Sequence, residues 1–195
     1  SATSLLILDL DRFKTINDVH GHLDGDQVLQ QVADVLRSSF DQTALIGRIG
    51  GDEFSVLLPA SDIVRAQDVA AEFASRFRST FTSHTKAAAL GVSVGIAAFP
   101  THGDSLRQLQ NNADAALYRA KAAGRGQICL FDRVLDQQMR ERRRLEEELR
   151  RAVKAQEFFL LYQPIVDAQS GLPQGYEALL RWHHPTYGVL SPAVF

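Results

Sequence analysis

Leu5-Leu6-Ile7-Leu8-Asp9-Leu10-Asp11 is the most informative segment of this chain. A short run that is apolar at nearly every position is typical of a buried strand rather than of a strand with one wet face. The run ends in two acidic residues that are separated by a single leucine. Because functional sites are commonly built where strands end, we expect Asp9 and Asp11 to lie at such a site.

Further along the chain, the apolar residues recur with the periods of helices and strands in turn. A helical period begins at Asp26, two strands flank the turn Gly50-Gly51-Asp52-Glu53, and Ser61 is the expected N-cap of a long helix. The remaining predicted elements are a strand region at 87–99, a helix at 106–120 closed by Gly124, and a strand at 128–131. This order predicts an α+β domain with helices on a mostly antiparallel sheet.

The composition changes after residue 131. Positions 132–156 carry a narrow apolar helical stripe among Arg and Glu runs, which favours i,i+4 ion pairs on a solvated helix. Strands predicted at 158–166 and 176–182 follow, with too little chain to bury a core. We therefore expect a domain at 1–131 that lacks an upstream segment, a linker helix at 132–156, and the incomplete start of a second domain at 157–195.

The composition also limits the classes of protein. The chain has 195 residues, 45% of them hydrophobic and 23% charged, which is typical of a globular chain. A net charge of −2 gives no basic field for nucleic acid. One cysteine, Cys129, excludes an internal disulfide framework and indicates a reducing compartment. We therefore expect a cytoplasmic protein without a nucleic-acid partner, and membrane attachment through regions outside this chain stays open.

The glycine turn suggests a site for a phosphate-bearing ligand. Gly50 and Gly51 allow positive φ angles and let a bulky anion approach main-chain N–H groups. If the hairpin lies beside the first strand, Asp52 and Glu53 face Asp9. Carboxylates of this kind suit Mg²⁺, which binds one or two of them together with substrate phosphate oxygens.

Two basic residues match this interpretation. Lys121 and Arg125 are four positions apart, so a helix would present them on one face, where they could neutralise phosphate charge. Taken singly, each of these patterns also fits a solvated turn or an ordinary surface residue.

Taken together and in this order, the clusters resemble the GGDEF family of diguanylate cyclases. The resemblance covers most of residues 5–131. It rests on Asp9-x-Asp-x-Phe-Lys, Asn17-Asp18, Gly21-His22, Gly25-Asp26, Gly50-Gly51-Asp52-Glu53-Phe54, Ser93-Val94-Gly95-Ile96-Ala97 and the run from Ala113 to Arg125. One small departure is Gly126, where family members often have Asn.

The resemblance implies a reaction and a set of roles. Two GTP molecules condense to cyclic di-GMP with release of pyrophosphate, each GTP on one subunit, so that a homodimer is needed for turnover. The metal, Mg²⁺ or Mn²⁺, is held by Asp9, the Leu10 carbonyl and Asp52. Asp52 and Glu53 are the implied catalytic residues, and the implied substrate-binding residues are Lys14, Asn17, Asp26, Gly50, Gly51, Lys121 and Arg125.

One feature of many family members is missing. Product inhibition uses an Arg-x-x-Asp motif that ends five residues before the glycine pair, and this chain has Asp41-Gln42-Thr43-Ala44 there. We therefore expect no feedback through that position.

The end of the chain resembles the opening of an EAL phosphodiesterase domain. The matching residues are Phe159 to Val166, Glu177-Ala178-Leu179-Leu180-Arg181-Trp182, His184-Pro185 and Gly188 to Pro192. The resemblance implies that Glu177 is a metal ligand and that the chain cannot hydrolyse cyclic di-GMP by itself. Two alternatives to the cyclase stay open: a GTP-binding module that regulates the EAL domain without turnover, and an inert fragment.

Overall fold

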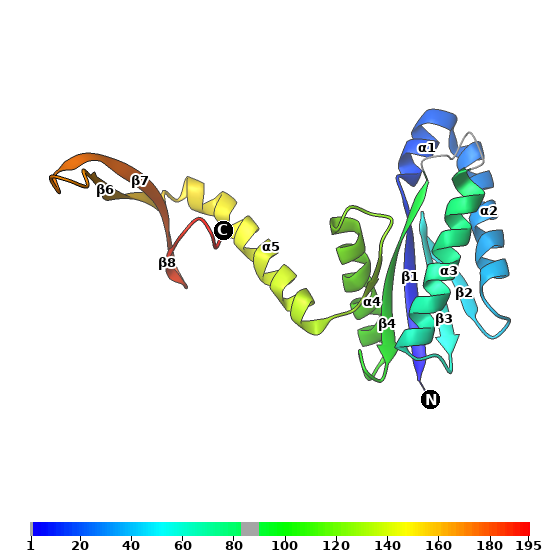
Figure 1. The fold of residues 1–195 in the computed structure, drawn as a ribbon. Helices are drawn as coiled ribbons and strands as arrows, with labels where there is room; N and C mark the ends of the chain where they lie inside the picture. Colours follow the sequence, from blue (N-terminus) through cyan, green and yellow to red (C-terminus); the bar gives the residue numbers. More distant parts are fainter. Residues whose placement is uncertain (1, 83–89) are drawn as a thin grey trace. The chain divides into compact units, whose positions relative to one another are not determined.

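The computed structural model describes residues 2–82 and 90–195, except for the side chains of residues 82, 142 and 143. The chain divides into two compact units, Ser1–Arg133 and Val134–Phe195. Each unit has its own sheet (Figure 1).

The first unit is built on a five-stranded sheet with the strand order β2-β3-β1-β4-β5. Neighbouring strands are antiparallel except for β4 and β5, which are parallel. The predicted α+β architecture with a mostly antiparallel sheet is therefore confirmed. The elements are β1 (Thr3–Asp11), α1 (Phe13–His20), α2 (His22–Ser39), β2 (Leu45–Gly50), β3 (Glu53–Pro59), α3 (Ile63–Thr82), β4 (Gly91–Phe99), α4 (Leu106–Ala122) and β5 (Ile128–Leu130).

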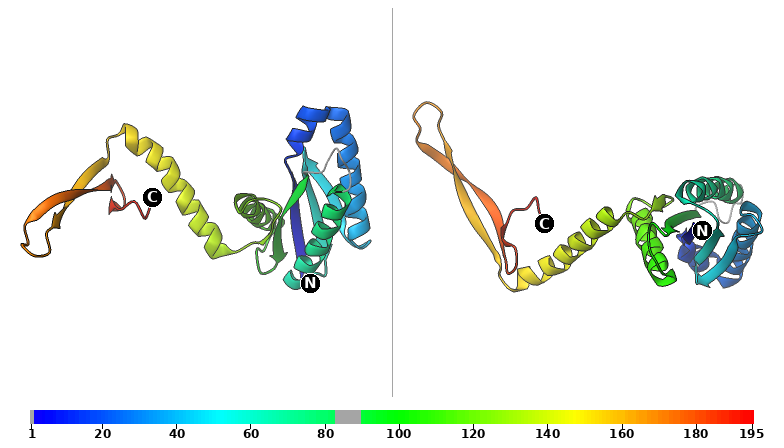
Figure 2. Two further views of the ribbon diagram at one scale, coloured as in Figure 1. Left: turned by 45° about the horizontal axis from the view of Figure 1, so that its top comes forward. Right: turned by 90° about the horizontal axis from the view of Figure 1, so that it is seen from below.

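Helices cover both faces of this sheet (Figures 1 and 2). On β1, Leu6 and Leu8 belong to a core formed with α1, α2 and α3, whereas Leu5 and Ile7 pack with α4. Because successive strand side chains point to opposite faces, a central strand that is covered on both sides must be apolar at successive positions. The same alternation puts Asp9 on the face that carries α4.

The segment between β1 and residue 26 differs from the prediction. The predicted helical period began at Asp26, but α1 occupies Phe13–His20 and α2 begins at His22. Gly21, with a φ of 85°, separates the two helices. Phe13 and Ile16 are buried, and this pair is too short an apolar pattern to predict α1 from its period.

Two other predicted boundaries change. The N-cap of α3 is Asp62 and not Ser61, because Oδ1 of Asp62 accepts a hydrogen bond from the N–H of Arg65. The strand region predicted at 87–99 contains β4 at Gly91–Phe99, and positions 87–89 lie outside the described residues.

The second unit consists of α5 (Arg133–Lys154) and a three-stranded antiparallel sheet of β6 (Phe158–Val166), β7 (Pro173–His184) and β8 (Gly188–Leu190). Trp182 is fully buried, and its indole N–H donates to Oε2 of Glu157 at 3.0 Å. His184 is also buried and contacts Glu148 of α5. Helix α5 is therefore bonded to the sheet of this unit.

Within residues 2–82 and 90–195, every helix is too short or too polar to cross a bilayer.

Candidate functional site

The end of β1 lies against the turn between β2 and β3. Asp9 stands opposite Glu53 in the antiparallel register, and the N–H of Leu10 donates to the carbonyl of Asp52 at 3.2 Å. The condition stated for a shared site, that the hairpin lies beside the first strand, is therefore met. The carboxylates of Asp9, Asp52 and Glu53 are brought to one end of the sheet from positions more than 40 residues apart.

The glycine turn is held in place by an arginine to which the sequence pattern assigned no role. Arg48 donates from Nε and Nη2 to the carbonyl of Gly51, at 3.0 and 2.7 Å. Gly51 has a φ of 50°, which favours glycine, and the register shifts between Arg48 and Gly50. The available signal for Arg48 was a basic residue two positions before the glycine pair.

Asp9 is nearly buried and is paired with a lysine. Nζ of Lys121 lies 2.6 Å from Oδ2 of Asp9. Burial raises the pKa of the Asp9 carboxyl, the bond to Lys121 lowers it, and the charges of Asp52 and Asp11 raise it further. The net direction is upward, as expected for a carboxylate that is removed from water among other carboxylates.

Asp11 anchors the loop that follows α4. Its carboxylate accepts hydrogen bonds from Oγ of Ser93 at 2.8 Å and from the N–H of Gly126 at 2.9 Å. Nε of Arg125 lies 4.0 Å from the same carboxylate. Helix α4 ends at Ala122, and Arg125 has a φ of 65° in the loop.

The prediction that Lys121 and Arg125 share a helical face is therefore wrong. The backbone turns after Ala122, and Arg125 reaches the acidic end of β1 through the loop instead of through the period of the helix.

The residues implied to read guanine come from α1 and α2. Asn17 lies on α1, and its side-chain oxygen lies so close to Gly25 that a Cβ there would overlap it. Asp26 is exposed on α2, and Lys14 is exposed on α1. Glycine at position 25 thus gives the Asn17 amide its place between the two helices.

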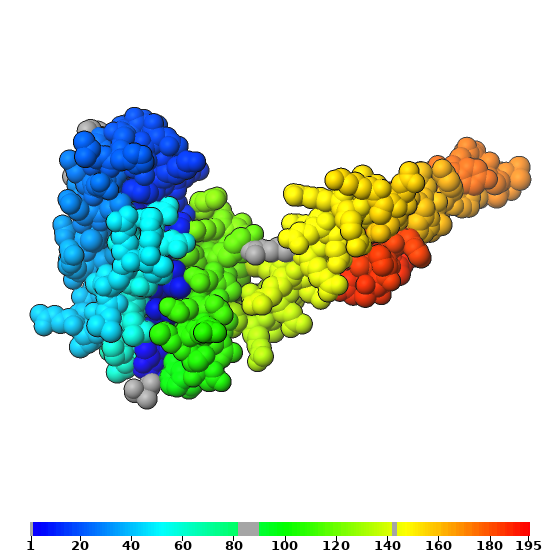
Figure 3. Space-filling model, turned by 180° about the vertical axis from the view of Figure 1, so that it is seen from behind, coloured from blue at the N-terminus to red at the C-terminus, as the bar shows by residue number. Residues whose placement is uncertain are grey.

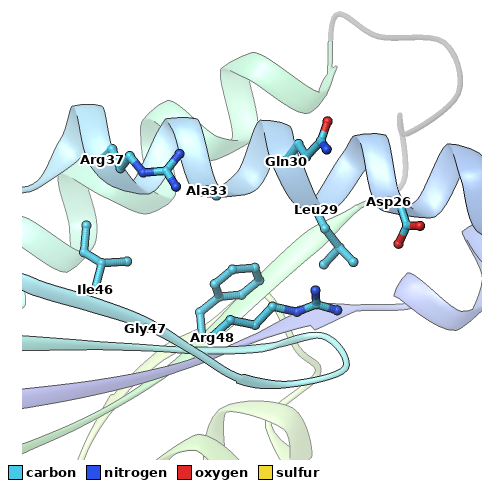
Figure 4. Close-up of a pocket in the computed structure, with 9 residues that line it drawn as sticks. Asp26, Leu29, Gln30, Ala33, Arg37, Ile46, Gly47 and Arg48 are labelled. Atoms are coloured by element: carbon cyan, nitrogen blue, oxygen red, sulfur yellow. The ribbon is translucent and has the colours of Figure 1, made fainter.

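A cavity of about 400 Å³ runs between α2 and β2 (Figure 4). Asp26 and Arg48 lie toward one end of it and Arg37 toward the other. Leu29 and Phe54 are among the apolar residues that line it. The volume lies within the range of small-molecule sites. In the space-filling view, the surfaces of α1 with α2 (blue) and of β2 with β3 (cyan) adjoin on one face of the first unit (Figure 3).

The donor set suits a hard divalent cation. Among residues 2–82 and 90–195, no group of three or more His, Cys, Asp or Glu side chains is arranged to hold a metal. The implied set needs only two carboxylates, Asp9 and Asp52, with the carbonyl of Leu10. Mg²⁺ takes one or two carboxylates and completes its shell with water and substrate phosphates, so these residues fit it.

The position of the missing feedback motif is occupied by internal bonds. Asp41 accepts hydrogen bonds from the N–H and the hydroxyl of Thr43, and its other oxygen lies 2.9 Å from Nη2 of Arg65. The hydrogen bonds from Thr43 are the main cause of a lowered pKa of Asp41. The carboxylate therefore serves the α2–β2 turn and the start of α3.

Comparisons with known proteins agree with this geometry. A family model described as "Diguanylate cyclase, GGDEF domain" matches residues 1–127, and an EAL-domain model matches residues 146–195. The chain is 37% identical over 192 residues to the bifunctional diguanylate cyclase/cyclic di-GMP phosphodiesterase MucR of Pseudomonas aeruginosa, a match that covers 98% of this chain and 28% of that protein. It is 36% identical over 191 residues to the cyclic di-GMP phosphodiesterase PdeR of Escherichia coli, at 98% and 29% coverage.

Among solved structures, an EAL/GGDEF domain protein of M. capsulatus has a TM-score of 0.62 at 37% identity, covering 68% of this chain and 86% of that one. This chain thus spans less than a third of each of the two curated relatives.

Proposed function

Because the chain belongs to the GGDEF family of diguanylate cyclases, we propose that its first unit condenses two molecules of GTP into cyclic di-GMP. The observation that carries the proposal is the meeting of Asp9, Asp52 and Glu53 beside Lys121 at the end of β1. In such a site the carboxylates can bind a divalent metal, and the metal and the lysine can stabilise the negative charge on phosphoryl oxygens.

The proposed chemistry is a phosphoryl transfer. The 3′-hydroxyl oxygen of one GTP attacks the α-phosphorus of the other, the new P–O bond forms, and the bond to pyrophosphate breaks. The hydroxyl proton passes to a base, for which we propose Asp52. Two such steps close the ring of cyclic di-GMP and release two pyrophosphates.

The metal implied by the family would be held by Asp9, the Leu10 carbonyl and Asp52, with Glu53 in support. When bound, Mg²⁺ or Mn²⁺ supplies charge stabilisation at the phosphoryl oxygens. Lys14, Lys121 and Arg125 would bind the phosphates, and Gly50 and Gly51 leave room for them. Among the described residues, no heavy atom beyond the chain neighbours lies within 4 Å of a Cβ placed at either glycine, which supports this assignment.

The guanine base would lie near Asn17 and Asp26. An ionised Asp accepts hydrogen bonds from the N1–H and N2–H groups of guanine, and an Asn amide both donates and accepts. The cavity lined by Asp26 and Leu29 supports this placement because it offers a carboxylate next to an apolar wall.

We also propose that turnover requires two copies of the chain, since each would hold one of the two GTP molecules, and that it takes place in the cytoplasm. The second unit would form the opening of an EAL phosphodiesterase domain, with Glu177 on β7 as one of its metal ligands. By itself this chain would not hydrolyse cyclic di-GMP.

The test is incubation of the chain with GTP and Mg²⁺, followed by chromatographic detection of cyclic di-GMP. Asp52→Ala should lower the rate by about 100-fold or more, because it removes a carboxylate that acts on the reacting atoms. Asp68→Ala is the matched control, since Asp68 is an exposed aspartate on α3 of the same unit. Equal rates for the wild-type chain and Asp52→Ala would contradict the proposal.

A second candidate is a GTP-binding module that regulates the EAL domain without turnover. The similarity to PdeR favours this candidate, because PdeR is named for phosphodiesterase activity alone and the match covers 98% of this chain. GTP binding by the wild-type chain without any cyclic di-GMP formed would support this candidate over the cyclase.

We propose in addition that cyclic di-GMP does not inhibit through the position of the missing motif. The internal bonds of Asp41 to Thr43 and Arg65 support this. Tight binding of cyclic di-GMP that is abolished by Asp41→Ala would contradict it.

A further inference from the structure

The ion pair between Lys121 and Asp9 joins two residues that the proposed function needs apart. Nζ of Lys121 is 2.6 Å from Oδ2 of Asp9, and the exposed fractions of the two side chains are 28% and 11%. A pair that is mostly removed from water is not weakened by solvent as a surface pair is. In the proposed function, however, Asp9 binds a divalent cation and Lys121 binds the triphosphate.

While Lys121 is bonded to Oδ2 of Asp9, that oxygen is not available to a metal, and the ammonium group is held by an anion other than a phosphate. The negative charges of Asp52 and Asp11 repel that of Asp9. The ammonium group of Lys121 offsets this repulsion in the absence of a metal. A divalent cation that arrives alone must either displace this lysine from Oδ2 of Asp9 or bind the carboxylate beside a positive charge that repels it. A triphosphate that arrives with the metal offers the ammonium group a new anionic partner at the same moment.

We infer that Lys121 is a resident cation that closes the metal site until a triphosphate draws it away. Divalent metal alone then binds weakly, and metal and triphosphate enter the site together. This inference rests on the proposed function, because it takes Asp9 as a metal ligand.

Arg125 does not share this role. Its guanidinium lies 4.0 Å from Asp11, and it is 56% exposed. The Asp11 carboxylate is also bonded to Ser93 and Gly126, so it anchors the loop after α4. Arg125 is therefore a matched control: it is a cation close to the same acidic end of β1 whose contact is with the anchored Asp11.

The first experiment measures the binding of Mn²⁺ alone to the 195-residue chain, from the electron paramagnetic resonance signal of the free ion. Lys121→Met should tighten Mn²⁺ binding about tenfold or more, because the competing ammonium group is gone. Arg125→Met should change it less than about threefold, as expected for the loss of a nearby charge. Asp9→Asn should weaken binding in both the wild-type and the Lys121→Met background.

The outcomes separate this inference from the proposed function. If Asp9→Asn weakens Mn²⁺ binding but Lys121→Met has no larger effect than Arg125→Met, the role of Lys121 is overturned and the metal assignment stands. If Asp9→Asn has no effect in either background, the metal assignment in the proposed function fails, and this inference fails with it. Lys121→Gln, together with circular dichroism, provides a second variant should Lys121→Met fold poorly.

The second experiment tests the lysine of the ion pair. It measures the binding of inorganic triphosphate in the presence of a chelator, so that no metal is present. Asp9→Asn frees Lys121 and should tighten triphosphate binding several-fold more than Asp52→Asn does. Asp52→Asn removes a neighbouring negative charge and keeps the ion pair. Equal effects of the two variants would mean that charge alone governs the binding, and would overturn the inference.

Discussion

β1 and β6 are both strands of nine residues that contain a pair of adjacent leucines, yet they differ in what covers them. Leu6 and Leu8 of β1 are 0% and 1% exposed, whereas Leu160 and Leu161 of β6 are both 47% exposed. Helices pack on both faces of β1, while the ladder of β6 in the described chain is to β7. The comparison shows that an apolar sequence predicts a strand suited to burial on both faces. The exposed fraction of its side chains, however, is set by the elements that pack on it.

In the second unit, the buried contacts gather at the end of the sheet that lies next to α5. The rings of Phe158, His184 and Phe195 pack on Trp182. Glu157 accepts the indole N–H, and Glu148 contacts His184. Because Trp182 is the single tryptophan of the chain, its fluorescence reports on this unit, whereas far-UV circular dichroism reports on both units.

The largest expected effect comes from a methyl group added to the sheet of the first unit, compared with a methyl group added to the sheet of the second. A Cβ at Gly95 of β4 would overlap the backbone of Ala113 and Leu117 of α4, so Gly95→Ala should destabilise the first unit by about 4 kcal/mol or more. Gly175→Ala on β7 is the matched control, since among the described residues no heavy atom beyond its two chain neighbours lies within 4 Å of the added Cβ. Urea unfolding followed by circular dichroism measures both. Similar losses in the two variants would break the comparison between the units.

A leucine truncation on each strand tests the burial difference directly. Leu6→Ala should cost about 3 kcal/mol, because it leaves a cavity in a closed core. Leu161→Ala should cost less than about 0.5 kcal/mol, because the half-exposed side chain loses little burial. The stability of Leu6→Ala is measured from the main circular dichroism transition, and that of Leu161→Ala from tryptophan emission. A loss above about 1 kcal/mol for Leu161→Ala would mean that β6 is covered in solution.

Glu148→Gln tests the polar contact that joins α5 to the sheet of the second unit. The hydrogen bond from His184 is the main cause of a lowered pKa of Glu148, so the ionised form stabilises the folded unit. The substitution should lower the urea midpoint seen by tryptophan emission, while the exposed Glu147→Gln should not. Because the pKa is depressed in the folded unit, the stabilisation is present above the ordinary glutamate pKa of 4.5 and is lost as the pH falls through the folded value. The variant should therefore lose less stability in acid than the wild-type chain, and an identical acid profile would refute this.

The smallest expected effect concerns His102, in the turn after β4. Its Nδ1 accepts a hydrogen bond from the N–H of Ala98 at 3.2 Å, and burial lowers its pKa from 6.5 despite the charge of Asp132. The folded state therefore favours neutral imidazole. The first unit should lose a small part of its stability as the pH falls from 6.5 toward the lowered folded pKa. His102→Gln should remove this decline in urea unfolding by circular dichroism, and an unchanged profile would argue against it.

Local patterns were sufficient to predict the core strand and the hairpin of the first unit, whereas the meeting of their carboxylates was given only as a condition and as what the family resemblance implies. The run from Leu5 to Leu8 indicated a strand covered on both faces, and the Gly50-Gly51 turn indicated the hairpin that brings Asp52 to Asp9. Helix α1 could not be predicted, because Phe13 and Ile16 are too few to establish a period. The loop geometry of Arg125 and its approach to Asp11 depend on a tertiary hydrogen bond from Gly126, which no local pattern encodes.

The directions of the strands place the first and last strands of the first unit so that their outer ends lie away from the acidic cluster. Thr3 begins β1 opposite Phe99, while Asp9 lies opposite Ser93 at the other end, and β5 runs parallel to β4 away from that acidic end. The backbone thus enters β1 at the end remote from Asp9, and leaves β5 heading toward that remote end. Both ends of the backbone of this sheet therefore point away from Asp9, and the acidic cluster lies where neither the first strand begins nor the last strand is heading.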